Sequence, residues 1–345
     1  MPSRTELRPA GVPPLADPPD LDRGRRDRER RSWGRPDPSL RRVLRRLARR
    51  RWGWPLAAMA AGVGVLVASL LPVRPLVPRG ARAWTRTVVV GDRRRSELVV
   101  APRQGTRGLP LYVVLHGSDA TPTFEERRTG LAYLAGQDRA VLVYPAGFGE
   151  SWNAGQGCCG PAGATHSHDA AFIEAVVADA ITHLGVDPRQ VFLVGYSNGG
   201  KMALRMLAAD PGAFAGVAVY GATALVPVGS GPAVPVLVAG GTADPRTPWS
   251  GPPRVQNGAL APSVVGTVGI LRRRDRANGP GETETLAGGR VTVTTWRGRS
   301  PRQVVALVGY RGRGHDWPQA HDSPLELAPL IVRFFDALRG SPAGS

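Results

Sequence analysis

From about residue 85 onward, short apolar runs alternate with longer segments in which apolar residues recur at helical spacing. Short β-branched runs are typical of buried strands, and the longer spacing is typical of amphipathic helices. The pattern predicts strands over residues 87–90, 97–100, 109–115, 140–144, 191–194, 216–220, 234–241, 290–296 and 303–308. It predicts helices over residues 124–137, 168–184, 201–209, 263–274 and 325–338. Alternating strands and helices indicate an α/β fold, with a mostly parallel central sheet flanked by helices.

The N-terminal part of the chain has a different pattern. Residues 1–51 are rich in Arg, Pro and Asp, which predicts a largely disordered tail. Residues 52–71 form an uncharged, mostly apolar run, and about 20 such residues can span a bilayer. The arginines before this run predict a cytoplasmic tail and a transmembrane signal anchor over 52–71. Residues 72–84 are then a Pro/Arg linker, and residues 85–340 are the folded domain.

A cleaved signal peptide is the alternative to an anchor. The segment Ala81-Arg82-Ala83 matches a small-x-small cleavage motif, although it lies well beyond the apolar run. Both interpretations place the folded domain outside the cytoplasm, either anchored to the membrane or secreted.

The formal net charge of +18 first suggests an anionic partner. Residues 1–51, however, hold 16 arginines against 7 acidic residues, so half of the excess lies in the tail. Lys201 is the only lysine, which indicates a compositional bias toward arginine over the whole chain. No nucleic-acid partner is therefore expected for the folded domain. The tail itself could contact lipid or nucleic acid in the cytoplasm, which a salt-sensitive binding assay would decide.

The segment Gly195-Tyr-Ser197-Asn-Gly199 joins a predicted buried strand to a predicted helix. A Gly-x-Ser-x-Gly turn in this context is the nucleophile-elbow pattern, in which a strained turn exposes the serine hydroxyl. The glycines let strand and helix approach each other closely. A Gly/Ser-rich turn between a strand and a helix is also common without any catalytic role.

Two further candidates follow other predicted strands. Asp244 comes after the strand over 234–241, and His315 comes after the strand over 303–308. The order Ser197, Asp244, His315 is that of an α/β-hydrolase triad, with serine as nucleophile, histidine as general base and acid, and aspartate orienting the imidazole. Taken alone, Asp244 before a proline could be a turn or a cap.

Backbone N–H groups near Ser197 could hold an oxyanion. The N–H of Asn198 follows the nucleophile, and that of Ser118 lies in the turn after the strand over 109–115. His116 is expected to be a buried histidine that braces this turn. His166, His168 and Asp169 do not have convergent metal-ligand spacing, so Asp169 is expected to be a helix N-terminal charge or a loop anchor.

Several motifs occur in the same order as in a known family. These motifs are Leu115-His116-Gly117, Trp152-Asn153 with Cys158-Cys159-Gly160, Asp169 with Phe172-Ile173, residues 195–202, Gly241-Thr-Ala-Asp244-Pro245 and Gly314-His315-Asp-Trp317-Pro318. With them, residues 109–338 resemble the polyhydroxybutyrate depolymerase and feruloyl-esterase-like family of secreted α/β-hydrolases. The resemblance implies an α/β-hydrolase fold and an extracellular serine esterase with Ser197, Asp244 and His315 as its triad.

The chain departs from this family at several points. Ser118 and Pro280 stand where relatives often have cysteine, and no appended polymer-binding module follows residue 340. We therefore expect short hydroxyacyl or aryl esters rather than an insoluble polymer as substrate. The adjacent Cys158 and Cys159 could form a vicinal disulfide or remain two thiols.

Trp152, Trp249 and Trp317 are candidates to line the acyl pocket, or they pack in the core. The expected function is an extracytoplasmic serine carboxylic-ester hydrolase that needs no metal or organic cofactor. Alternatives are a feruloyl or acetyl esterase acting on polysaccharide esters, a peptidase, or a catalytically silent binding protein of the cell envelope.

Overall fold

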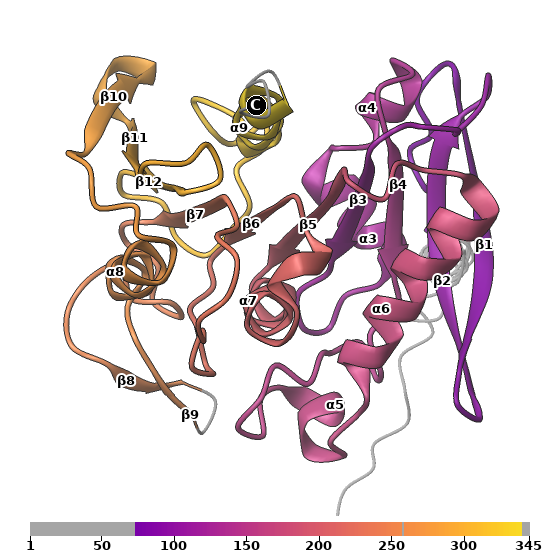
Figure 1. The fold of residues 1–345 in the computed structure, drawn as a ribbon, viewed down its shortest axis with the longest axis horizontal. Helices are drawn as coiled ribbons and strands as arrows, with labels where there is room; N and C mark the ends of the chain where they lie inside the picture. The colour runs from indigo at the N-terminus through magenta and orange to yellow at the C-terminus, as the bar shows by residue number, and fades with distance from the viewer. Residues whose placement is uncertain (1–72, 257–258, 340–345) are drawn as a thin grey trace, which may run out of the picture. The chain divides into compact units, whose positions relative to one another are not determined.

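A ten-stranded sheet organises the described part of the chain (Figure 1). The computed structural model describes residues 73–256 and 259–339, all within one compact unit, Pro72–Ser345. The strands lie in the order β1 (Ala81–Val90), β2 (Arg93–Pro102), β4 (Val141–Pro145), β3 (Leu111–Leu115), β5 (Val191–Tyr196), β6 (Gly216–Tyr220), β7 (Val236–Gly241), β12 (Val304–Tyr310), β11 (Val291–Arg297) and β10 (Glu282–Leu286). The strands from β4 to β12 in this order pair in parallel, and antiparallel strands extend both edges. The predicted mostly parallel sheet is confirmed.

Helices cover both faces of the sheet. One face packs against α6 (Asp169–Asp179), α7 (Asn198–Ala209) and α8 (Val264–Asp275). The other face packs against α4 (Tyr133–Gly136) and α9 (Leu327–Arg339), with α3 (Pro122–Thr129) preceding α4. The central strands β3 to β7 are buried along their whole length, which explains why their sequences are continuous apolar runs rather than alternating ones.

Two predicted helices are interrupted. The helix expected over 124–137 is two helices, because Gly130 ends α3 in a left-handed conformation with φ 66°. The helix expected over 168–184 becomes a π-turn over Ala180–Leu184 after α6. Glycine adopts the left-handed conformation without a steric penalty, so Gly130 is a natural stop.

The predicted linker over 72–84 is wrong at its C-terminal end. Strand β1 begins at Ala81, and all ten of its residues pair with β2, so the sheet starts before residue 85. The segment Ala81-Arg82-Ala83, considered above as a cleavage motif, is part of this strand.

Short or exposed elements were not predicted. They are α5 (Gly160–Ala164), β8 (Arg254–Gln256), β9 (Ala259–Ala261) and the edge strand β10. The side chains of β10 are mostly exposed, so its sequence carries no apolar signal. The predicted tail over 1–51 and anchor over 52–71 lie outside the described residues. Within 73–256 and 259–339, no helix has the length and apolarity needed to cross a membrane.

Candidate active site

Ser197 occupies a sharp turn between β5 and α7. Its backbone has φ 52° and ψ −115°, a combination that non-glycine residues rarely adopt. The neighbouring glycines make the turn possible, because a Cβ at Gly195 would collide with the backbone of Gly199, and one at Gly199 would collide with the end of β3. The turn therefore has the strained strand-to-helix geometry expected of a nucleophile elbow.

The structure brings Ser197, His315 and Asp244 together in one hydrogen-bonded chain. Nε2 of His315 lies 2.8 Å from Oγ of Ser197, and Nδ1 of His315 lies 2.6 Å from Oδ2 of Asp244. The three residues come from loops after β5, β7 and β12, at the carboxyl edge of the parallel strands. This is the arrangement needed to pass a proton from the serine hydroxyl to the imidazole.

Backbone donors hold the Asp244 carboxylate as an acceptor. Burial favours a raised pKa for Asp244, but hydrogen bonds from His315 and from the N–H groups of Thr247 and Arg246 outweigh burial and lower that pKa. Oδ1 accepts the N–H groups of Arg246 at 2.8 Å and Thr247 at 2.9 Å. An ionised carboxylate can only accept, so Nδ1 of His315 carries the proton and Nε2 is free to accept one from Ser197.

Tyrosines and a glycine position the His315 loop. The hydroxyl of Tyr196 donates to the carbonyl of His315 at 3.0 Å, and that of Tyr220 donates to the carbonyl of Gly314 at 3.2 Å. Gly221 follows with φ 61°, and a Cβ there would lie 2.9 Å from Cε1 of the imidazole. These supporting residues were not predicted, because the sequence does not show that they contact the His315 loop.

The predicted oxyanion donors border the serine. Asn198 is the first residue of α7, so its N–H has no acceptor within the helix. Its side chain is fixed by Trp152, whose N–H donates to Oδ1 at 2.7 Å and whose carbonyl accepts from Nδ2 at 2.9 Å. Ser118 follows β3 and lines the same cavity as Ser197. The structure thus places Asn198 next to the serine in the chain and Ser118 on the lining of the same cavity.

The sequence is 32% identical over 292 residues to a protein named "Putative esterase NocK" from Nocardia uniformis subsp. tsuyamanensis. The alignment covers 76% of this chain and 82% of that protein. The chain belongs to this esterase family. No protein-family model matches the sequence.

Solved structures of other esterases and hydrolases have the same fold. An acetyl xylan esterase from Aspergillus awamori matches with a TM-score of 0.55 and 18% identity, over 74% of this chain and 99% of that one. An S-formylglutathione hydrolase from Agrobacterium tumefaciens matches with a TM-score of 0.50 and 12% identity, over 77% and 99%. At these identities the likeness shows an α/β-hydrolase-like fold.

As predicted, His116 is a buried histidine that braces the turn after β3, which contains Ser118. Its Nε2 accepts the N–H of Gly147 at 2.8 Å, so its Nδ1 carries the proton and donates to the carbonyl of Gly117 at 2.7 Å. Burial lowers the pKa of His116 to about 4, which keeps the ring neutral. His116 therefore joins the turn after β3 to the long loop after β4.

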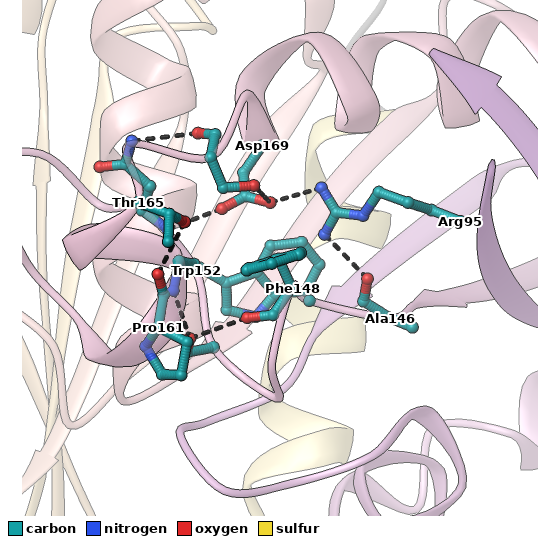
Figure 2. A network of polar contacts seen from close by, with 12 residues as sticks. Arg95, Ala146, Phe148, Trp152, Pro161, Thr165 and Asp169 are labelled. Carbon is teal, nitrogen blue, oxygen red and sulfur yellow. Dashed lines mark hydrogen bonds and ion pairs between the residues drawn. The ribbon is translucent and has the colours of Figure 1, made fainter. Parts of the chain in front are cut away.

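A buried polar network fixes that long loop (Figure 2). Asp169, at the start of α6, accepts from the guanidinium of Arg95 at 2.5 Å and from the N–H of Asn153 at 2.7 Å. Arg95 also donates to the carbonyl of Ala146 at 2.8 Å. These contacts favour the loop-anchor interpretation of Asp169. In the described part of the chain, no cluster of His, Cys, Asp or Glu could hold a metal ion.

A cavity of about 600 Å³ opens beside the serine. Most of the residues that line it are polar, and three of these residues are cations. The lining residues are Ser118, Asp119, Arg128, Tyr196, Ser197, Lys201, Arg246, Thr247, Val255, Gln256 and His315. Sequence reasoning missed Arg128 and Arg246, since arginine is common throughout the chain. Of the three cations, only Lys201 stands out in the sequence, because it is the only lysine.

The three tryptophans do not line this cavity. Trp152 is fully buried, and its Nε1 donates to the carbonyl of His116 at 2.8 Å. Trp317 is 3% exposed and packs against Tyr196 and Tyr220. Trp249 is half-buried and packs against the apolar core. The structure therefore corrects the pocket assignment toward core packing, because large apolar rings gain most when they are removed from water.

Cys158 and Cys159 are joined in a disulfide between chain neighbours. This is one of the two states expected from the sequence. Both residues belong to the long loop after β4 and are buried in the apolar core.

Proposed function

We propose that the esterase hydrolyses carboxylic esters through a Ser197–His315–Asp244 triad and an acyl-enzyme intermediate. The hydrogen-bonded chain from Asp244 to Ser197 is the observation that supports this proposal most strongly. Membership of the esterase family supplies the reaction class, and the residues supply the mechanism.

In the first half of the reaction, Oγ of Ser197 attacks the ester carbonyl carbon while its proton moves to Nε2 of His315. The resulting oxyanion accepts hydrogen bonds from the backbone N–H groups of Asn198 and Ser118. The imidazolium, stabilised by Asp244, then protonates the leaving alcohol as the carbon–oxygen bond breaks. An acyl group remains on Ser197.

In the second half, His315 takes a proton from water, and the hydroxide attacks the acyl carbon. Collapse of the second tetrahedral intermediate breaks the bond to Oγ, and the proton on Nε2 returns to Ser197. The products are a carboxylic acid and an alcohol.

Short hydroxyacyl or aryl esters are the proposed substrates, as for a polyhydroxybutyrate depolymerase-like enzyme. The polar lining of the cavity supports compact, oxygen-rich acyl groups over long alkyl chains. The apolar run over 52–71 supports an extracytoplasmic location, with the enzyme held at the membrane or secreted after cleavage.

The decisive test is hydrolysis of a 4-nitrophenyl ester series by the full chain, beside Ser197→Ala and covalent labelling with a fluorophosphonate. We expect Ser197→Ala to lower kcat by about 10³-fold or more and to abolish the label. Ser300→Ala, at an exposed serine in a distant turn, is the control and should retain both. Full turnover by folded Ser197→Ala would refute the proposed nucleophile.

A further inference from the structure

The cavity beside Ser197 has an unusual charge balance for an ester site. Arg128, Lys201 and Arg246 line it, and Asp119 is the only carboxylate among its lining residues. Asp244 is already occupied by His315 and two backbone N–H groups. Even with Arg128 paired to Glu125, the lining therefore holds more positive than negative charge.

Lys201 is the most informative of these cations. It lies on α7 four residues after Ser197, so both side chains lie on the same side of the helix start. The residue is only 6% exposed, and its ammonium is attracted by the carboxylate of Asp244 but makes no hydrogen bond or salt bridge with any residue in 73–256 or 259–339. Because Lys201 lines the cavity, a bound anion can supply the hydrogen-bonded partner that the protein does not provide.

The other two cations are arranged differently. The guanidinium of Arg128 is fixed, because it pairs with the buried Glu125 at 2.8 Å and stacks 4.3 Å above the ring of Tyr196. Arg246 is exposed and lines the same cavity, and its backbone N–H donates to Asp244. A ligand anion bound at Lys201 would therefore lie in a cavity that also presents Arg246.

We propose that the preferred substrates carry a carboxylate in addition to the scissile ester, and that Lys201 binds this carboxylate together with Arg246. This inference rests on the proposed function and names the substrate class of the same site. An ester of one hydroxy acid with another has such a carboxylate on its leaving group. The neutral ester of the same shape would leave the ammonium unpaired.

Two matched substrate pairs test the inference and locate the carboxylate. The leaving-group pair is 4-acetoxybenzoate and its methyl ester. The acyl pair is mono-4-nitrophenyl adipate and 4-nitrophenyl hexanoate. We expect kcat/KM for the anionic member of at least one pair to exceed that of the neutral member by roughly tenfold or more, since a charge-assisted hydrogen bond is involved. Added NaCl should reduce this ratio because it screens the attraction.

Lys201→Met should lower the anionic-to-neutral ratio by about tenfold, whereas a merely structural lysine would lower both rates and leave the ratio intact. Arg246→Met, at an exposed position, provides a second reading if the lysine variant fails to fold. Arg333→Met is the control, since Arg333 pairs with Glu284 on the surface, and the anionic-to-neutral ratio of this variant should match the wild type.

An anionic-to-neutral ratio of one or less in the wild type for both substrate pairs would overturn the inference but not the esterase activity. Loss of all hydrolysis and of the fluorophosphonate label would instead refute the proposed function.

Discussion

Replacing Asp244 with asparagine tests whether the backbone around it dictates the protonation state of His315. The substitution keeps the size of the side chain and replaces one oxygen with an NH₂ group. Two N–H groups, from Arg246 and Thr247, point at Oδ1, so the amide oxygen must face them. The new NH₂ group then faces Nδ1 of His315 and forces that nitrogen to be an acceptor.

The consequence is the wrong imidazole tautomer. With Nδ1 unprotonated, Nε2 carries the hydrogen and cannot take a proton from Ser197. The active tautomer of His315 requires the asparagine amide to flip. The flipped NH₂ group then faces the two backbone N–H donors, so both of those hydrogen bonds are lost. Losing two hydrogen bonds at a buried side chain costs about 2–6 kcal/mol, which leaves a productive fraction smaller by a factor of about 30 to 2 × 10⁴.

The assay is kcat for 4-nitrophenyl acetate, with thermal unfolding to show that the variant is folded. We expect kcat to fall by about 10²–10⁴ with little change in unfolding temperature. Asp316→Asn is the matched control, because Asp316 is exposed beside His315, and it should behave as the wild type. A folded Asp244→Asn enzyme within tenfold of wild-type kcat would refute this account of the site.

Three further substitutions test the supports of the site and the core. Gly221→Ala should lower kcat by about tenfold or more, because the new Cβ would displace the triad imidazole. Gly312→Ala is its control and should keep kcat, because Gly312 has a similar positive φ, at 71°, but open space where the Cβ would lie. Asp169→Asn should cost about 3 kcal/mol of unfolding free energy in urea because it leaves a buried arginine uncompensated, and Asp336→Asn, in an exposed pair, should cost less than about 1 kcal/mol. Burial raises the pKa of Glu97 to about 7. The native state thus keeps a proton that the unfolded chain releases, so stability should fall as pH rises from about 4.5 to about 7, and Glu97→Gln should weaken this dependence by up to about 3 kcal/mol. An unchanged pH dependence of unfolding in Glu97→Gln would contradict the assignment.

The central strands and the serine turn could be predicted because their signals are local. Strands β3 to β7 are buried on both faces, and the strand–turn–helix context of Ser197 lies within one short segment. The order of Asp244 and His315 after later strands was enough to select them, because parallel strands present their ends at one edge.

The rest of the site depends on contacts that the sequence does not display. Trp152 and Trp317 were pocket candidates as large aromatic residues in the motifs that carry the family resemblance, yet burial of their rings places them in the core. Arg128 reaches the cavity from α3 only because Glu125 and Tyr196 hold its guanidinium. The edge strand β10 was missed because its side chains face solvent.

The hydrogen-bonded triad joins residues that are far apart along the chain. His315 lies 71 positions after Asp244 and 118 after Ser197, and β6, β7 and β12 must all be in register before the three side chains meet. Contacts of such high sequence separation form late during folding, after local helices and hairpins. Ester turnover should therefore return only in the final phase of refolding, later than the far-UV circular dichroism signal. The recovery of turnover then reports when the sheet is complete.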